Sequence, residues 1–452
     1  MCRTSDTGDT MNRILRHHGF AILAAVILPL SIAGTCRRQS GVKKVPQIRL
    51  VQGFEATDLT PPTREIRPAA AARALPPAAP SGVAGYPMAY GNESRNSRAS
   101  QPLPAGDWRV RWRVSVKAEP GPVLVLQQGN RILVRAVDWQ LLEPGGGVLA
   151  AGPAAGGPIV LDAAHDLFYR FLPSAYLAAA RLSDGHQAFL LSPAYGDSFS
   201  RVFMARHGDR LLMAAVERPL DPHGGRQPSR SLFEAVDLRE PFETTGLGLL
   251  KSVSSPGELR IGSVGLVAAA TANSIVAAVP DCIFLAGWDM IVRLALTGTF
   301  DPVRMSLDEA GRIYLVVRSG QRFALWLVDP DGERLYAVDL PESVPEPSGP
   351  PIVAPDHTAY LIAGSQVIAV APDGKLNWLK AASGRVAGAI VTADDQLVLA
   401  EGDAITAWNR LGQRRVVHVI PGEQLNSPPV LASNGDLLVA SQGSLFCLSR
   451  LK

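Results

Sequence analysis

The sequence predicts an all-β fold built from repeated four-stranded sheets, and three observations indicate it. The 452 residues include 42 glycines and 36 prolines but only 19% charged residues, a composition typical of many turns and few helices. A hairpin unit recurs along most of the chain. A strand without a local partner precedes the first unit, while the last unit lacks one strand. Together these features predict a β-propeller.

The repeat unit is a short apolar strand, a polar turn and a second apolar strand. Eight copies are found, at 125–134, 160–169, 203–213, 267–278, 305–316, 353–363, 391–400 and 431–440. A second strand pair follows most copies, most clearly in 322–340, 366–381 and 404–420. The mean period of about 44 residues lies within the range of propeller blades. Each unit is therefore predicted to form one four-stranded blade.

The two ends of the repeat region are predicted to pair. Only the strand at 444–449 follows the eighth hairpin, and the strand at 107–117 precedes the first. We expect 107–117 to complete the last blade and close the ring, because closure removes exposed sheet edges. Eight blades are predicted. Seven blades are the alternative, because 274–287 aligns with the repeat almost as well as 267–278 does.

Residues 1–36 are predicted to be an export signal. A basic stretch at 12–19 precedes a continuous apolar run at 20–34, which is short for a membrane span and typical of a signal peptide. Cys36 follows directly, an arrangement that resembles the bacterial lipoprotein signal, although Ala33 replaces the usual leucine. Cys36 is thus the candidate lipid attachment site. A cleaved soluble form and an uncleaved anchor are the alternatives, and all three export the chain.

The rest of the chain divides into a tether and the propeller. Residues 37–84 are rich in proline, alanine and arginine and show no apolar periodicity, which predicts a disordered tether. Residues 85–452 are assigned to the propeller. The net charge is only +3, so no large basic face for a nucleic acid partner is expected.

Three segments resemble the PQQ-like (quinoprotein-type) β-propeller repeat family: 348–384, 426–449 and 85–116. Trp378 and Trp112 stand where this family has its blade-docking tryptophans. The family includes quinone-dependent dehydrogenases that carry adjacent cysteines, and this chain has no adjacent pair. The resemblance is therefore to the non-catalytic branch, which is exported and lipid-anchored and uses the propeller as a scaffold. It implies no catalytic residues and no cofactor.

The remaining chemical motifs are interpreted as structural. Asp329–Glu333 is assigned to a blade turn rather than to a calcium site, because Leu340 stands where a calcium loop needs glutamate. No metal site is predicted. Four histidines are expected to be solvated turn residues: His165, His207, His223 and His357. Cys282 and Cys447 are interpreted as buried thiols, with a disulfide between them as the alternative.

The longest polar insertion, 218–230, is a candidate interaction loop, because long loops on rigid scaffolds often carry function. Its candidate contact residues are Arg218, Asp221, His223, Arg226 and Arg230. A tolerated surface insertion is the alternative.

The predicted function is a non-catalytic protein-interaction scaffold in the bacterial cell envelope. Its partners would be envelope proteins, and its N-terminus would attach it to the membrane. A quinone-dependent or other propeller oxidoreductase is one alternative. A glycan or cell-wall binding module is another, and it would use exposed aromatic side chains, for which the candidates are Trp139, Trp288, Trp326 and Trp408. If these tryptophans are instead buried between blades, they carry no such role.

Overall fold

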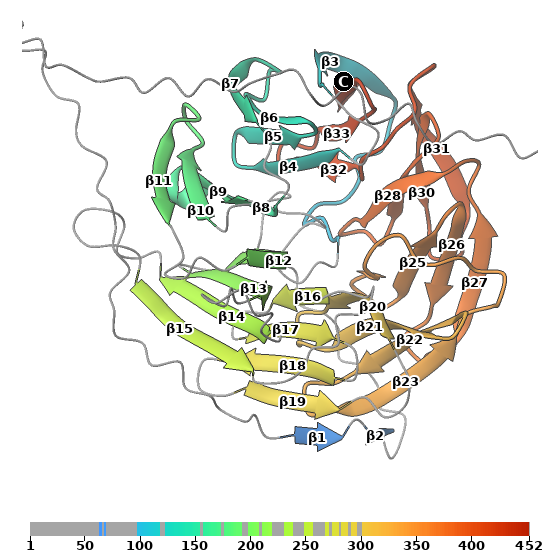
Figure 1. Ribbon diagram of the computed structural model, residues 1–452. Coiled ribbons are helices and arrows are strands. Elements are labelled where there is room, and N and C mark those ends of the chain that lie inside the picture. The colour runs from blue at the N-terminus through green and yellow to red at the C-terminus, as the bar shows by residue number, and fades with distance from the viewer. Residues whose placement is uncertain are drawn as a thin grey trace, which may run out of the picture. The chain divides into compact units, whose positions relative to one another are not determined.

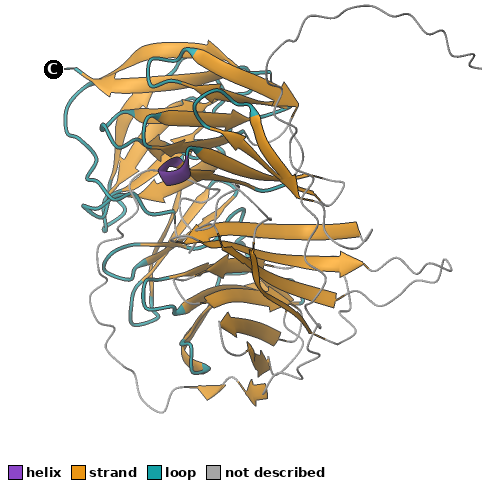
Figure 2. Cartoon of the chain, turned by 90° about the vertical axis from the view of Figure 1, so that its left-hand side faces the viewer, coloured by secondary structure: helices purple, strands orange, loops and turns teal. Residues whose placement is uncertain are grey.

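The computed structural model describes the repeat region almost throughout and little of the first 96 residues (Figure 1). The described residues are 63–65, 67–68, 97–117, 123–153, 157–172, 176–191, 198–207, 210–218, 230–237, 248–255, 267–270, 274–279, 282–287, 291–295 and 301–451. Within them, nearly all regular structure is β-strand, and η1 (Ala163–His165) is the one helical turn (Figure 2). No helix in these residues is long and apolar enough to span a membrane.

The described strands form eight sheets. The first four sheets in chain order are β4 (Leu124–Gln128), β5 (Arg131–Arg135), β6 (Asp138–Leu142) and β7 (Val148–Pro153); β8 (Ile159–Asp162), β9 (Leu167–Leu172), β10 (Tyr176–Arg181) and β11 (Gln187–Leu191); β12 (Ser198–His207), β13 (Arg210–Arg218), β14 (Arg230–Asp237) and β15 (Gly248–Ser255); and β16 (Val267–Ala270), β17 (Ser274–Val279), β18 (Cys282–Gly287) and β19 (Ile291–Ala295).

The other four sheets follow the same order. They are β20 (Asp301–Leu307), β21 (Ile313–Ser319), β22 (Arg322–Val328) and β23 (Glu333–Asp339); β24 (Ile352–Val353), β25 (Ala359–Ala363), β26 (Gln366–Val370) and β27 (Leu376–Ala381); β28 (Val386–Val391), β29 (Leu397–Glu401), β30 (Ala404–Trp408) and β31 (Arg414–Val419); and β32 (Val430–Leu431), β33 (Leu437–Ala440), β34 (Ser444–Arg450) and β3 (Trp108–Ser115).

The sheets lie around a common centre, which makes the fold the predicted β-propeller (Figure 1). In the described residues, the first strands of successive sheets contact each other from β4 through β8, β12, β16, β20 and β24 to β28, and β32 contacts β4. Each of the eight hairpins found in the sequence forms the first two strands of its own sheet. The hairpin at 267–278 is β16 and β17, so the alternative alignment of 274–287 is not adopted.

The outer strand of the last sheet comes from the N-terminal side of the repeat region, as predicted. β3 runs antiparallel to β34, with Trp108 opposite Arg450 and Ser115 opposite Ser444. The main chain continues this pairing at one end, where the Val116 amide donates to the Gly443 carbonyl at 3.0 Å.

One part of the predicted tether needs correction. Two short strands, β1 (Thr63–Glu65) and β2 (Arg67–Pro68), lie within 37–84, where we expected no regular structure. β1 pairs in parallel with β19, and β2 pairs in parallel with β23. The sequence pattern gave no signal for them, because main-chain pairing at a sheet edge needs no apolar periodicity.

The core lies between neighbouring sheets, which explains the apolar pattern of the strands. β25 and β30 are buried along their whole length, because the sheets on both sides cover their two faces. The outer strand β31 is largely exposed instead. Leu133 of β5 and Leu438 of β33 belong to one apolar cluster, so the first and last sheets share a core.

Candidate functional site

The two tryptophans predicted to dock blades make the same contact with the next sheet. Trp378 of β27 donates a hydrogen bond from Nε1 to the Arg410 carbonyl at 2.8 Å. Trp112 of β3 donates from Nε1 to the Pro144 carbonyl, also at 2.8 Å. Both acceptors lie in the turn between the third and fourth strands of the following sheet.

A β-bulge sets this position in four outer strands. Ala150, Tyr336, Trp378 and Trp112 each follow the extra residue of a bulge between the outer strand and its neighbour. A bulge redirects the following side chain. Each of these four side chains lies against the turn between the third and fourth strands of the next sheet, which contains Gly185, Gly374, Gly412 or Gly146, respectively.

The turn that Trp378 contacts is held by several hydrogen bonds. Asn409 Oδ1 accepts hydrogen bonds from the Leu411 amide at 3.0 Å and from the Gln413 amide at 2.9 Å, an arrangement typical of asparagine turns. Gly412 has a φ of 68°. Lys380 Nζ donates to the Leu411 carbonyl at 3.1 Å and to the Gly412 carbonyl at 2.9 Å.

Arg410 ties the same turn to two further turns. Its guanidinium pairs with Asp395, and its Nε lies 3.3 Å from a carboxylate oxygen of Asp356. Asp395 belongs to the turn between β28 and β29, and Asp356 to the turn between β24 and β25. The turn at 409–413 is therefore held rigidly, although it lies at the surface.

This rigid turn carries the most exposed large apolar side chain of the described residues. Leu411 is 69% exposed, and Val416 and Val419 of the adjoining β31 are 50% and 42% exposed. We call these three residues of the β30–β31 hairpin the rim surface. Isolated exposed leucines are ordinary in soluble proteins. Three such side chains on one rigid hairpin are a candidate protein-binding surface, because little entropy is lost when a fixed anchor binds.

A second group of contacts surrounds Arg98, near the centre of the ring where the first strands of the sheets lie. Arg98 forms a parallel bridge with Val391 at the end of β28, and the Ala99 amide donates to the Val391 carbonyl at 2.8 Å. Arg98 Nη1 also lies 2.9 Å from Glu309 in the turn between β20 and β21. Burial raises the pKa of Glu309, and the nearby Arg98 charge opposes this shift.

The same segment continues to the last sheet. The Leu103 amide donates to Asp394 at 3.1 Å, and Gln101 Nε2 donates to the Ser433 carbonyl at 2.9 Å. Residues 97–103 therefore contact the fifth, seventh and eighth sheets near the centre of the ring (Figure 1). No local pattern in the sequence predicts this, since Arg98 and Glu309 are 211 residues apart.

Two buried carboxylates link neighbouring sheets, and one of them corrects the expectation for His357. Asp308 accepts from Arg312 Nε at 2.6 Å, and Arg312 Nη2 lies 3.2 Å from His357 Nδ1 in the next sheet. His357 is buried rather than solvated. Asp162 lies 2.8 Å from His165 Nδ1, and His165 is partly exposed in the turn η1, where a turn residue was expected.

Asp162 makes the same kind of link between the second and third sheets. Its carboxylate lies 3.0 Å from Arg206 Nε of β12, while Tyr169 donates its hydroxyl to it at 3.2 Å. Asp162 ends β8 and Asp308 directly follows β20, so both lie at the end of the first strand of a blade hairpin. Within each cluster the charged side chains pair with one another, and each cluster holds two blades together.

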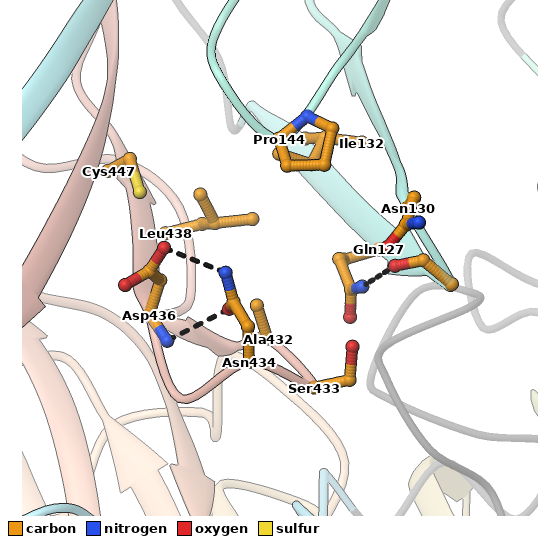
Figure 3. Close-up of a pocket in the computed structure, with 11 residues that line it drawn as sticks. Gln127, Asn130, Ile132, Pro144, Ala432, Ser433, Asn434, Asp436, Leu438 and Cys447 are labelled. Carbon is orange, nitrogen blue, oxygen red and sulfur yellow. Dashed lines mark hydrogen bonds between the residues drawn. The ribbon is translucent and has the colours of Figure 1, made fainter.

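A small pocket lies at the junction of the first and last sheets (Figure 3). Its volume of about 40 Å³ holds about three water molecules. Gln127 donates from Nε2 to the Gly129 carbonyl at 2.6 Å on one side, and Asn434 bonds to Asp436 at 2.9 Å on the other. Cys447 also lines it. The pocket suits ordered water rather than a substrate.

The other residues singled out from the sequence lie as follows. Arg218 ends β13 and Arg230 begins β14, so the candidate interaction loop connects these strands. Asp221, His223 and Arg226, like Cys36, lie outside the described residues. Trp139, Trp326 and Trp408 are buried, which removes them as an exposed glycan platform, and Trp288 lies outside the described residues.

The segment 329–333, two cysteines and two histidines were also interpreted from the sequence. Asp329 Oδ1 accepts from the Asp331 and Glu333 amides at 3.0 and 2.9 Å, so this segment is the predicted blade turn. Cys282 and Cys447 are buried and are not joined by a disulfide, as expected. His207 ends β12 and is not in a turn, and His223 lies outside the described residues.

Comparison with known proteins identifies the fold. No protein-family profile matches the chain, and no curated protein matches it. Among solved structures it is similar to BamB from Moraxella catarrhalis, at 12% identity and a TM-score of 0.53, over 76% of this chain and 99% of that one. It is also similar to a europium-containing methanol dehydrogenase, at 11% identity and a TM-score of 0.56, over 81% and 98% of the two chains.

A third similar structure is the quinohemoprotein alcohol dehydrogenase from Comamonas testosteroni, at 11% identity and a TM-score of 0.58, over 82% of each chain. These structures are β-propellers of the quinoprotein type or BamB, which supports the predicted PQQ-like fold. Identities this low establish the fold alone. One fold carries many functions, so an activity has to be argued from the site.

Proposed function

We propose that the protein is an exported, envelope-anchored β-propeller that acts as a non-catalytic protein-interaction scaffold. The observation that carries this proposal is the rim surface, where a turn fixed by Trp378, Lys380 and Arg410 holds Leu411 in solvent. A preorganised apolar anchor is the usual centre of a protein–protein contact. Such a contact needs no cofactor and no catalytic group.

Export and anchoring are part of this proposal and rest on the sequence. The apolar run at 20–34 and Cys36 after it would place the propeller outside the cytoplasm and hold it at a membrane. The candidate loop between Arg218 and Arg230 would add a second, polar contact to the same partner or to another one.

Cross-linking in the native envelope tests the scaffold function. Tagged wild type and the variant Leu411→Asp/Val416→Asp are cross-linked in cells, and the attached proteins are identified by mass spectrometry. We expect one or more proteins to be lost from the variant, because a charge at an apolar anchor is costly to bury. The matched control is Val148→Asp, which alters a residue of β7 that is 53% exposed. An identical set of proteins on all three forms would contradict the proposal.

The enzyme alternative is favoured by the similarity to two dehydrogenases. Its test is direct: pyrroloquinoline quinone and calcium are added to the purified protein, and binding is measured by calorimetry. Dye-linked oxidation of alcohols and sugars is measured in parallel. The scaffold proposal predicts neither binding nor turnover, and tight stoichiometric binding with turnover would overturn it.

A further inference from the structure

The outer edges of two neighbouring blades are already paired with an extended segment of this chain. β1 places Thr63, Arg64 and Glu65 opposite Arg293, Leu294 and Ala295 of β19. β2 places Arg67 and Pro68 opposite Glu333 and Arg334 of β23. Residues 63–65 and 67–68 therefore lie along the edges of two neighbouring sheets (Figure 1).

Among the described residues this pairing is short, and β1 and β2 cover only part of each strand that receives them. β1 and β2 together form five residue pairs, and these are parallel, the less stable arrangement. Pro61 and Pro62 precede the segment and Pro68 ends it, and proline has no amide hydrogen to extend the ladder. β23 has seven residues, of which β2 pairs with the first two.

The edges themselves supply the recognition. The run Thr-Arg-Glu-Ile-Arg-Pro has no alternating apolar pattern, so main-chain hydrogen bonds carry the pairing. In the register of this pairing, the position of Arg67 lies opposite Glu333. The exposed carboxylate of Glu333 favours a basic residue at the facing position of a paired strand.

We propose that the outer edges of β19 and β23 form a strand-acceptor site for an extended segment of a partner protein, and that residues 63–68 occupy it until the partner arrives. The partner segment would pair in parallel, carry a basic residue opposite Glu333 and continue along β23 beyond Arg334, the last residue that β2 pairs with. This proposal rests on the scaffold function above and names the kind of partner the scaffold takes.

A partner strand has to compete with residues 63–68 for the site. Residues 63–68 are joined to Ser97 by 28 residues (69–96) and so compete at a high effective concentration. A partner strand that pairs with all of β23 gains contacts that residues 63–68 do not make. If residues 63–68 occupy the site nine-tenths of the time, an outside strand binds the wild type about ten-fold more weakly than a chain with the site vacated.

The experiment uses the full chain and a defined peptide. The variant Arg64→Pro/Glu65→Pro/Arg67→Pro removes the pairing, because successive amides point to opposite sides and at least one of residues 64 and 65 must face β19. The control variant Glu55→Pro/Ala56→Pro/Thr57→Pro changes the tether elsewhere. The probe is a fluorescent peptide with the sequence of residues 60–70, and its shuffled form is the control peptide.

Two measurements are made on each form. Hydrogen exchange should show protection of 291–295 and 333–334 in the wild type and the control variant, and loss of protection in the pairing variant. Fluorescence anisotropy should show that the probe binds the pairing variant at least about ten-fold more tightly than the wild type. Bound peptide should restore protection at both edges.

The proposal is overturned if the pairing variant exchanges like the wild type, if the probe does not bind it, or if the shuffled peptide binds equally well. Thermal melting of each variant shows that the propeller is intact. Cross-linking at the rim surface is an independent readout. Partners lost on Leu411→Asp/Val416→Asp but no peptide binding would leave the scaffold function standing and remove the strand-acceptor site.

Discussion

The indole nitrogen of Trp378 donates a hydrogen bond to the carbonyl oxygen of Arg410, 32 residues further along the chain. Trp112 and Pro144 are related by the same spacing and the same 2.8 Å distance, across the junction of the last and first sheets. The same tryptophan-to-carbonyl hydrogen bond therefore links two blades that are consecutive in the sequence and also links the last blade to the first.

The first prediction is that this contact stabilises the propeller. Trp378→Ala should lower the free energy of unfolding by about 2–4 kcal/mol, because a large, partly buried ring and its packing are lost. Trp378→Phe keeps most of the ring and should cost about 1 kcal/mol for the hydrogen bond. Urea unfolding measures both. Leu411→Ala on the same turn is the control, since its exposed side chain should leave stability unchanged; a cost equal to that of Trp378→Ala would contradict this account.

The second prediction concerns the glycine beneath Trp112. Gly146 has a φ of 87°, and a Cβ there would lie 2.9 Å from the Trp112 ring. Gly320 has a φ of 61° and nothing within 4 Å of such a Cβ. Gly320→Ala should therefore cost only the backbone strain, about 1–2 kcal/mol, while Gly146→Ala should cost clearly more. Equal losses in urea unfolding would show that the close approach to Trp112 does not matter.

The third prediction concerns the pairing of β3 with β34. Deleting 107–117 removes the outer strand of the last sheet and the Trp112 contact with the first sheet. We expect a lower melting temperature and aggregation in light scattering, because a hydrogen-bonding edge is left open. A deletion variant that melts and scatters like the wild type would show that closure by this strand is not needed.

Much of the fold could be predicted from the sequence because the signal is local. Residues 359–363 are apolar throughout, since sheets cover both faces of β25, and a polar turn separates them from β24. The docking position could be predicted only where it holds tryptophan. Tyr336 and Ala150 occupy it in other sheets, because the position needs a side chain against a turn glycine and not an indole.

The rest of the candidate site had no local signal. The exposure of Leu411 depends on Lys380 and Trp378, which are about 30 residues away and in another sheet. β1 and β2 pair through the main chain and leave no side-chain pattern. His357 was expected in solvent because its neighbours in sequence are polar, but Asp308 and Arg312 of the preceding sheet enclose it.

The fourth prediction tests the membrane anchor. If lipid is attached to Cys36, Cys36→Ala should move the protein from the membrane fraction to the soluble envelope fraction. Fractionation and N-terminal sequencing measure this. A variant that stays in the membrane and keeps residues 20–34 would instead favour an uncleaved anchor, and unchanged release of both forms would favour a cleaved soluble protein.

The fifth prediction follows from the buried thiol of Cys447. Burial, reinforced by the nearby Asp436, raises its pKa from 9.0 to about 12. The folded protein therefore keeps this proton up to about pH 12, whereas the unfolded chain loses it above about pH 9. The stability that the buried thiol contributes is complete below pH 9 and is lost as the pH rises from 9 to 12.

At pH 10.5 this loss should amount to about 1–2 kcal/mol relative to pH 8. Urea unfolding of the wild type and of Cys447→Ala at both pH values isolates it, because tyrosines and lysines affect both proteins alike. The variant should lose less stability than the wild type between the two pH values. In the native protein at pH 8 the thiol should also resist Ellman's reagent until urea unfolds the chain. Rapid labelling of Cys447 in the folded state, or identical pH dependence of the two proteins, would show that the thiol is not enclosed between the first and last sheets.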